Sequence, residues 1–316
     1  MAAPHWVRPL YTQFLLKMMT MDFWTEIPSL GKRDLRDLKK SIDSAFKGFS
    51  REYGDNIEAF FDPLYYFLVW LEKLLIAAPW PIILFVVAGL SYLGSRSWKL
   101  ALGSVLSFVI IGYFGMWKDM MATISLISVA TIICIAIGIP VGILMSRYDR
   151  VQSAITPILD LMQTIPIFVY LLPVVMLLGI GRVPGLIAVC VYALPPIIRL
   201  TNLGIRLVDK EILEAADAFG SSYRQKLFDV QIPLALPNIF AGVNQTIMMA
   251  LAMVVIASMI GVKGLGMPVL QAIQNQYLTL GLMNGLAIVA LAIIFDRVSQ
   301  RYGKRLQAHR YGKDHE

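Results

Sequence analysis

Residues that could do chemistry are sparse in this chain of 316 residues, and they do not cluster. The three histidines, His5, His309 and His315, lie near the two ends of the chain, and the two cysteines, Cys134 and Cys190, lie inside long apolar runs. An enzyme needs a grouped nucleophile, acid–base pair or metal set, and a metal site needs several ligands at suitable spacing. The sequence therefore predicts neither a catalytic site nor a metal site. It also contains no G-x-x-x-x-G-K-[ST] phosphate loop, so we expect no ATPase activity from this chain.

A charged, alanine-rich segment, EILEAADAFGSSYRQKLFDVQIPLALP, interrupts this apolar chain. Leu213, Ala216 and Phe219 recur at helical spacing, and Gly220 is expected to end their helix. A second short helix is expected over residues 222–230. The prolines at positions 233 and 237 should stop it and start the next membrane helix. We predict a compact helix-turn-helix at the membrane surface, onto which another protein docks.

Composition indicates a polytopic membrane protein of the all-α class. Hydrophobic residues make up 57% of the chain and charged residues 16%, against about 25% charged residues in soluble domains, and the mean hydropathy is +0.66. A membrane helix needs about 20 predominantly apolar residues. Seven spans are expected, near Trp80–Leu93, Trp98–Phe114, Ala122–Met145, Ile155–Gly179, Pro184–Ile198, Phe240–Ile260 and Leu280–Phe295.

An eighth apolar run, Phe60–Ala77, contains Glu72 and Lys73. A charge at the bilayer centre costs about 2.5 to 3.5 kcal/mol on insertion scales. The sequence therefore favours an amphipathic helix at the membrane interface for this run, and an eighth span remains the alternative.

The basic residues indicate the orientation. The net charge is +7, and Lys and Arg gather near positions 96–99, 147–150, 206–226 and 301–313. Polytopic proteins keep such residues on the cytoplasmic side, so this excess does not indicate nucleic-acid binding. Seven spans would place the N-terminus outside, whereas the basic run from Lys32 to Arg51 favours the inside, so the side of the N-terminus stays open.

Four regions are expected along the chain. Residues 1–59 form an N-terminal tail, whose Leu35, Leu38, Ile42 and Phe46 predict an amphipathic helix. Residues 60–118 hold the first membrane helices. Residues 119–297 form the transport core, with the charged segment at about 206–238, and residues 298–316 form a basic cytoplasmic tail.

The charged segment resembles the EAA loop of ABC-importer permeases. Its Glu214-Ala215-Ala216 is followed by three residues, Gly220, nine residues and then Val230, Ile232 and Pro233, with valine in place of the usual isoleucine. The stretches at 159–188, 193–206 and 241–266 resemble permeases of the glycine betaine/proline (quaternary-amine uptake) family. That likeness covers about residues 60–297.

The resemblance implies the transmembrane domain of a type I ABC importer in the bacterial inner membrane. Its coupling helix, about residues 208–220, would fit a groove of a partner ATPase that binds ATP and Mg²⁺, and this chain would bind no cofactor. A separate substrate-binding protein, a permease homodimer and a small zwitterionic or quaternary-amine substrate are also implied. The expected ATPase-coupling residues are Glu214, Ala215, Ala216, Phe219, Gly220 and Pro233.

Candidate residues of the translocation pathway are polar, aromatic or sulfur-bearing groups in or near the spans. The six are Gln163, Thr164, Tyr170, Asn244, Gln245 and Met249. Methionine and tyrosine could offer a soft surface to a methylated ammonium group. The alternatives are ordinary packing and hydrogen bonds between membrane helices, which are worth about 0.6 to 2 kcal/mol, and the sequence does not separate these readings.

A second function class, an ion-coupled secondary transporter, would be expected to bury ionisable groups near the membrane midplane. The charges nearest to the spans, Asp160 and Arg199, are both expected near the cytoplasmic interface. Such a carrier also has no use for an EAA loop. A passive channel would need no ATPase partner, so co-purification with an ATPase would exclude it.

Overall fold

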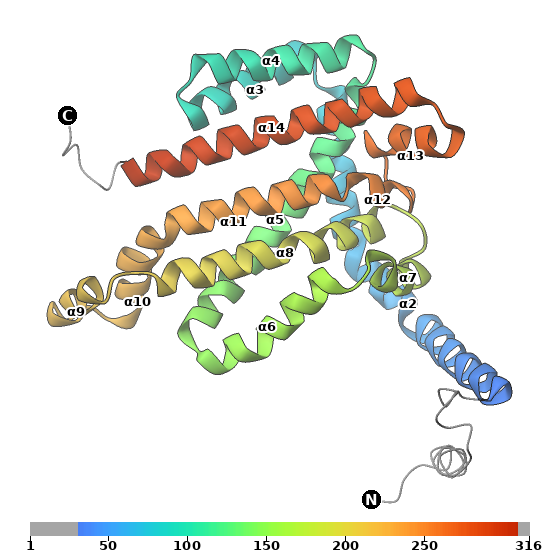
Figure 1. Ribbon diagram of the computed structural model, residues 1–316, viewed down its shortest axis with the longest axis horizontal. Helices are drawn as coiled ribbons and strands as arrows, with labels where there is room; N and C mark the ends of the chain where they lie inside the picture. The colour runs from blue at the N-terminus through green and yellow to red at the C-terminus, as the bar shows by residue number, and fades with distance from the viewer. Residues whose placement is uncertain (1–30, 309–316) are drawn as a thin grey trace, which may run out of the picture. The chain divides into compact units, whose positions relative to one another are not determined.

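The computed structural model describes residues 31–308, with side chains up to Gly303, and this part of the chain is helical and contains no strand (Figure 1). The all-α prediction is confirmed. The chain divides into two compact units, residues 1–55 and 56–316. All three histidines, together with Arg310 and Lys313 of the expected basic tail, lie outside the described residues.

Helix α2 (Lys32–Ala77) has 46 residues and crosses the division between the two units. The predicted domain boundary between residues 59 and 60 therefore falls inside one continuous helix. In the first unit, the predicted amphipathic stripe lies on this helix, with Leu35, Leu38 and Ile42 exposed. The expected boundary was placed where the apolar run begins at Phe60, and a change from polar to apolar composition does not end a helix.

The run from Phe60 to Ala77 packs against the transport core. Leu68 is buried, its carbonyl accepts a hydrogen bond of 3.3 Å from Ser125 Oγ, and Glu72 accepts one of 2.9 Å from Arg182 Nη2. The interfacial prediction rested on the cost of burying Glu72, and the guanidinium of Arg182 compensates that charge. This run meets α3 (Trp80–Ser95) at a bend of 107°, and the two together are long and apolar enough for one broken span.

Within the described residues, four unbroken helices are long and apolar enough to cross a membrane, at Trp117–Arg147, Arg182–Arg206, Tyr223–Ala252 and Leu278–Gly303. The number rises to six if each of two bent helix pairs is counted as one span. The seven separate spans expected from the sequence are therefore not all present as straight helices. The short helix α4 (Trp98–Tyr113) has only 16 residues. The expected span Ile155–Gly179 is broken into α6 (Asp149–Thr164) and α7 (Ile167–Leu178), bent by 92°.

Proline explains this break. Ile165 is extended, as a residue before proline prefers, and Pro166 caps the first turn of α7. The prolines at positions 140, 173, 195 and 196 instead lie inside continuous helices. Among these five prolines, only Pro166 stands at a break.

The core is built from α5 (Trp117–Arg147), α8 (Arg182–Arg206) and α11 (Ile232–Ala252), with α14 (Leu278–Ala308) packed on α11 (Figure 1). Small residues permit the contact between α5 and α8. A Cβ atom at Gly142 would lie 2.6 Å from Thr201 Cβ and 2.8 Å from the Ile198 carbonyl oxygen. Membrane helices associate through such close backbone approach, so this glycine sets the spacing of the two helices.

Short elements complete the second unit. After α11, the chain breaks at Met253 and continues as α12 (Val254–Ser258), so the expected span Phe240–Ile260 ends early. Helix α13 (Gly266–Asn275) then leads into α14. Between α8 and α11 lie α9 (Lys210–Ala218), α10 (Tyr223–Gln225) and the π-helix η2 (Lys226–Gln231).

Candidate functional site

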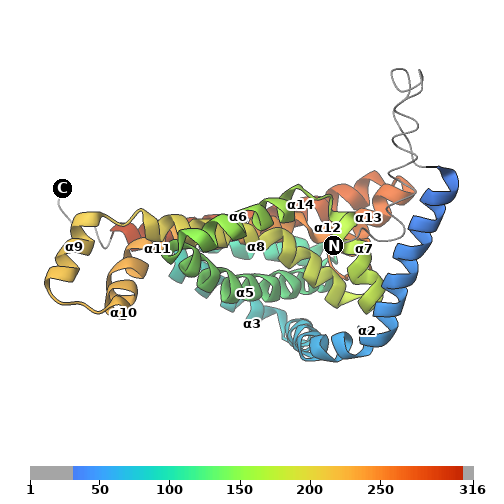
Figure 2. The same ribbon diagram turned by 90° about the horizontal axis from the view of Figure 1, so that it is seen from below.

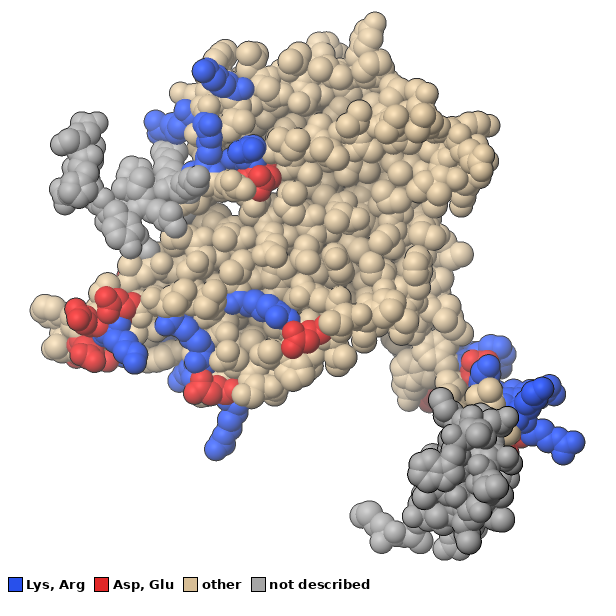
Figure 3. All heavy atoms as spheres, viewed as in Figure 1, with Lys and Arg blue, Asp and Glu red and all other residues tan. Residues whose placement is uncertain are grey.

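The segment from Asp209 to Gln231, called the α9–η2 segment below, lies at one end of the second unit next to the α5–α6 turn (Figures 1 and 2). Lys and Arg gather at the same end in the space-filling view, over the α5–α6 turn and near the C-terminal end of α14 (Figure 3). The positive-inside rule predicts that this end faces the cytoplasm.

Helix α9 is held by caps from its own sequence. Asp209 accepts a hydrogen bond of 3.0 Å from the Glu211 backbone N–H at the N-terminus. At the other end, the Gly220 N–H bonds the Asp217 carbonyl and the Ser221 N–H bonds the Ala216 carbonyl. This pair is the Schellman motif, and Gly220 adopts the left-handed conformation that it requires, with φ of 75°. The prediction that Gly220 ends the helix is confirmed.

Five of the six expected coupling residues lie on α9 or at its C-terminal end. Glu214, Ala215 and Gly220 are exposed, and Phe219 has 91% of its surface exposed, whereas Ala216 is half-buried. An aromatic side chain exposed beside alanines offers an apolar contact and a close backbone approach. This combination suits a protein partner better than water.

The second half of the segment differs from the prediction. Ser222 and Gln225 form a reciprocal capping box that starts α10, but the helix does not stop at Pro233. It passes through η2 directly into α11, where Pro233 occupies the first turn. Proline lacks a backbone N–H and fits a first turn, and the wider π-turn before it absorbs the change of hydrogen-bond register. Pro233 is half-buried and belongs to α11.

Two side-chain contacts fasten the α9–η2 segment. Lys226 Nζ lies 2.6 and 2.8 Å from the two carboxylate oxygens of Asp217, joining η2 to the last turn of α9. The guanidinium carbon of Arg147, the last residue of α5, lies 4.0 Å from the ring centroid of Tyr223, within cation–π range. The first contact stabilises the segment internally, and the second attaches it to α5.

Arg206, the last residue of α8, ties three helix ends together. Its Nη2 donates hydrogen bonds of 2.9 Å to the Met145 carbonyl near the end of α5 and of 2.7 Å to the Asp149 carboxylate at the start of α6. Its Nε donates one of 3.0 Å to Asn202, one turn back on α8. Guanidinium suits this task because it presents several donors in a fixed plane.

Sequence reasoning missed the contacts of Arg147, Arg206 and Lys226. It used these side chains only as markers of the cytoplasmic side, because the positive-inside rule counts charges without pairing them. Asp217 and Lys226 are nine residues apart in a segment with an expected turn, so their ion pair could have been predicted from the local sequence. The partners of Arg206 at Met145 and Asp149 lie 61 and 57 residues away, and no local signal connects them.

The candidate pathway residues fall into two groups. In the first, Gln163 of α6 lies against Met249 of α11, with 3.9 Å between Nε2 and Sδ. Tyr170 of α7 packs on the core, and its buried hydroxyl has no hydrogen-bond partner among the described residues. Thr164 is exposed and donates to the Asp160 carbonyl one turn back in its own helix. The bent α6–α7 pair therefore brings Gln163 next to α11 while Thr164 stays on the surface.

In the second group, Asn244 joins α11 to α14. Its Nδ2 donates a hydrogen bond of 2.8 Å to Asp296, and its Oδ1 accepts one of 2.6 Å from Ser299. The interhelical alternative, left open by the sequence, therefore describes Asn244 in this structure. Gln245 is exposed, and the neighbouring Thr246 is buried and donates to the Ala193 carbonyl of α8.

The two charges considered for ion coupling pair with each other. Arg199 Nη2 lies 2.6 Å from Asp160 Oδ1, and the two side chains are 40% and 56% exposed. Their exposure agrees with an interfacial position and not with a buried carboxylate of an ion relay. Within the described residues, no group of three His, Cys, Asp or Glu side chains could hold a metal ion.

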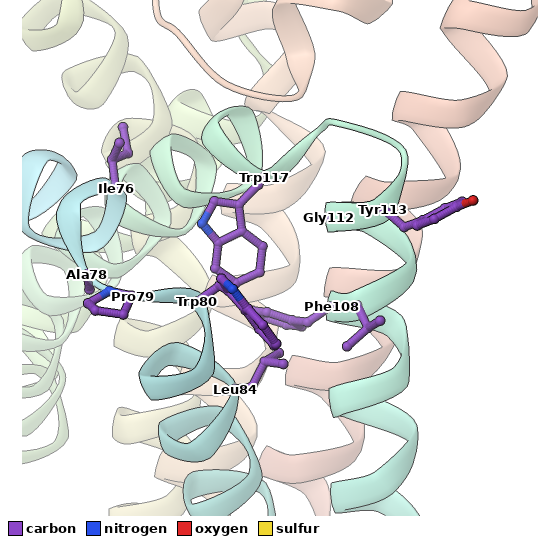
Figure 4. Close-up of a pocket in the computed structure, with 10 residues that line it drawn as sticks. Ile76, Ala78, Pro79, Trp80, Leu84, Phe108, Gly112, Tyr113 and Trp117 are labelled. Carbon is purple, nitrogen blue, oxygen red and sulfur yellow. The ribbon is translucent and has the colours of Figure 1, made fainter.

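The cavity of about 620 Å³ between α2, α3, α4 and α5 lies outside both groups of pathway candidates. Figure 4 shows Trp80, Trp117 and Phe108 around it, and its other lining residues are aliphatic apart from Tyr113. A site for a small zwitterion needs a few convergent polar groups. This apolar cavity does not provide them, so its size does not make it the substrate site.

Comparison with known proteins identifies the family. Residues 135–308 match the family described as "binding-protein-dependent transport system inner membrane component". The chain is 48% identical over 242 residues to the glycine betaine/proline betaine transport system permease protein ProW of Escherichia coli, covering 77% of this chain and 68% of that protein. It is 44% identical over 232 residues to the glycine betaine/carnitine transport permease protein GbuB of Listeria monocytogenes, covering 73% and 82%.

The fold has a solved counterpart. The described helices resemble a chain in an inward-facing crystal structure of the MetNI methionine ABC transporter, with a TM-score of 0.54 and 20% sequence identity, over 58% of this chain and 93% of that one. The matched family region, residues 135–308, begins within α5 and extends through the α9–η2 segment to the end of α14. This chain therefore belongs to the family of binding-protein-dependent transport system inner membrane components, and it is a membrane transport subunit and not an enzyme.

Proposed function

We propose that this chain is the permease subunit of an ATP-driven importer for glycine betaine or a related quaternary amine. The observation that carries the proposal is the exposed face of α9, with Glu214, Ala215 and a 91% exposed Phe219 on a helix capped at both ends. A rigid helix whose apolar tip points away from its own protein is suited to insertion into a groove of a partner.

The partner in this proposal is a cytoplasmic ATPase. The chain has no phosphate loop of its own, so ATP and Mg²⁺ would bind to that partner. Closure of two ATPase subunits would pull two copies of α9 together. Because α9 is joined to α8 by three residues and to α11 through a continuous helix, the movement would reach the membrane core.

The remaining partners follow from the same proposal. A separate substrate-binding protein would deliver the substrate at the outer face, and two copies of this permease would enclose one translocation pathway. Support for the first comes from the family description, which names binding-protein-dependent transport. The homodimer is the simplest way for one kind of permease chain to provide two docking helices.

The proposed substrate class rests on the relatives. The names of the E. coli and Listeria proteins specify glycine betaine with proline betaine or carnitine, and that of a Ruegeria pomeroyi relative, 37% identical, specifies trimethylamine N-oxide. These compounds share a methylated nitrogen. Met249, the nearby Gln163 and Tyr170 are the residues that we propose to line the pathway, since thioether and aromatic groups attract such nitrogens weakly.

Uptake of radiolabelled glycine betaine into proteoliposomes tests this proposal. The complex would contain this chain, its ATPase and its binding protein, with wild type compared with Gly220→Asp and Glu214→Lys. We expect uptake that requires ATP and the binding protein and falls at least tenfold in both variants. Glu214→Ala, which adds no opposite charge, is the milder matched variant.

Other outcomes would reassign the function. Uptake driven by an ion gradient without the ATPase would favour the secondary transporter. ATP hydrolysis by an assembled complex without uptake of glycine betaine would retain the ABC machine and reject the substrate, and competition with carnitine, proline and trimethylamine N-oxide would then identify the class.

A further inference from the structure

The corner between α5 and α6, residues 145–149, contacts the chain on both sides of α9. Before α9, Arg206 at the end of α8 binds the Met145 carbonyl and the Asp149 carboxylate. After α9, Tyr223 at the start of α10 lies under the guanidinium of Arg147. Both contacts reach the same five-residue corner, although α9 itself projects away from it (Figure 2).

We infer that Arg206 and Arg147 are positioning residues that transmit movement of α9 to the α5–α6 corner during transport. This inference rests on the proposed function, because it assigns a route to the coupling that α9 would perform. Together the two arginines make the corner, the end of α8 and the start of α10 move with α9. They add two side-chain contacts to the backbone connections that α9 makes through α8 and α11.

Buried neighbours fix the position of the Arg206 guanidinium. Asn202 is 7% exposed and accepts the Nε hydrogen bond, which fixes the plane of the guanidinium. Met145 is 1% exposed, so the carbonyl that Arg206 reaches belongs to a well-packed turn. That carbonyl is among the last of α5 and has no partner further along the helix, so a cation there is favourable.

The Arg147 contact is more exposed and depends on an aromatic face. Its guanidinium carbon lies 4.0 Å from the Tyr223 centroid and 5.0 Å from that of its neighbour Tyr148. Tyr223 directly follows the capping residue Ser222 that starts α10. A pull on α9 through the Gly220 turn therefore reaches this ring before it reaches the membrane helix α11.

The corner leads to the candidate pathway. Helix α6 begins at Asp149, and Gln163, in its last turn, lies against Met249 of α11. Movement of the corner would therefore shift Gln163 relative to α11. This arrangement connects the cytoplasmic docking surface to the pathway candidates by a second route, in addition to α8.

The test is the coupling ratio, the number of substrate molecules imported per ATP hydrolysed, measured in proteoliposomes with the complete complex. Arg206→Lys removes the planar guanidinium but keeps the positive charge, whereas Arg206→Ala removes both. Arg147→Ala and Tyr223→Ala each remove the contact between Arg147 and Tyr223. Arg150→Ala is the matched control, since Arg150 is an exposed residue of the same turn and its side chain makes no hydrogen bond or ion pair with the described residues. Tyr223→Phe keeps the ring and serves as the conservative variant.

We expect the four contact variants to lower the coupling ratio at least fivefold while the basal ATPase rate and the amount of assembled complex stay within twofold of wild type. Arg150→Ala and Tyr223→Phe should match wild type. The double variant Arg147→Ala with Tyr223→Ala should be no worse than either single variant, because both remove one contact. A purely structural role would lower assembly and ATPase activity together and leave the ratio unchanged.

The inference fails if wild type transports and the contact variants retain its coupling ratio. If the complex with Arg206→Ala does not assemble, the coupling ratios of Arg206→Lys and Tyr223→Ala decide instead, and wild-type ratios in both would contradict the inference. Absence of ATP-dependent uptake in wild type would instead count against the proposed function, so the two failures are distinguishable.

Discussion

The α9–η2 segment and the interface of α5, α8 and α11 are stabilised in different ways. In the segment, helix caps come from residues two to five positions away, as with Asp209, Gly220 and Ser222. In the core, contacts join residues that are far apart, as Thr246 of α11 donates to the Ala193 carbonyl of α8 across 53 positions. The difference teaches that an exposed segment is stabilised by residues close to it in the sequence, whereas a membrane core depends on the packing of distant segments.

The largest expected effect concerns the core. Gly142→Ala would place a Cβ atom 2.6 Å from Thr201 Cβ, and overpacking of this kind costs about 1 to 3 kcal/mol. Gly103→Ala on α4 is the matched control, because a Cβ there meets nothing within 4 Å. Thermal unfolding in detergent should show a lower midpoint for the first and no loss for the second. Equal stability of the two variants would contradict the close approach of α5 and α8.

A smaller effect is expected where α11 meets α14. Asn244→Ala leaves Asp296 and Ser299 without the bridging amide, and hydrogen bonds between membrane helices are worth about 0.6 to 2 kcal/mol. Gln245→Ala, an exposed neighbour, should leave the free energy of unfolding unchanged. If Asn244→Ala changes the KM of uptake but not the unfolding midpoint, Asn244 contacts the substrate and not α14.

The smallest effect belongs to the α9–η2 segment. Lys226→Ala removes the pair with Asp217, whose side chains are 23% and 55% exposed, and partly exposed pairs contribute about 0 to 1 kcal/mol. Hydrogen exchange of the α9 amides should rise slightly at low salt and be indistinguishable from wild type at high salt. Complete loss of protection in α9 would show that the pair, and not the helix caps, holds this segment.

The contrast between local caps and distant contacts explains which features the sequence predicted correctly and which it did not. The helical class, α9 with its stop at Gly220, and the start of α10 at Ser222 follow from local patterns, because caps act within a few residues. The continuity of η2 with α11 did not follow, because Pro233 is compatible both with a stop and with a first turn. Glu72 was assigned to the interface because its partner, Arg182, lies 110 residues away.

The contacts of the candidate pathway residues were less predictable than helix α9 for the same reason. Spacing in sequence could not tell that Asn244 bonds α14 while Met249, five residues later, meets α6. Nor could composition reveal that Pro166 breaks a span while Pro140 and Pro173 do not. For Asn244 and Met249 the outcome depends on which distant helix packs alongside.

The most direct test of the central claim, that the tip of α9 docks onto the ATPase, is site-specific photo-crosslinking in the assembled complex. A photoreactive amino acid would replace Phe219, which is 91% exposed, or Tyr113 on α4, which is 86% exposed and serves as the control. The account predicts a crosslink to the ATPase from position 219 and none from position 113. Absence of a crosslink from position 219 in a complex that hydrolyses ATP and imports substrate would contradict it.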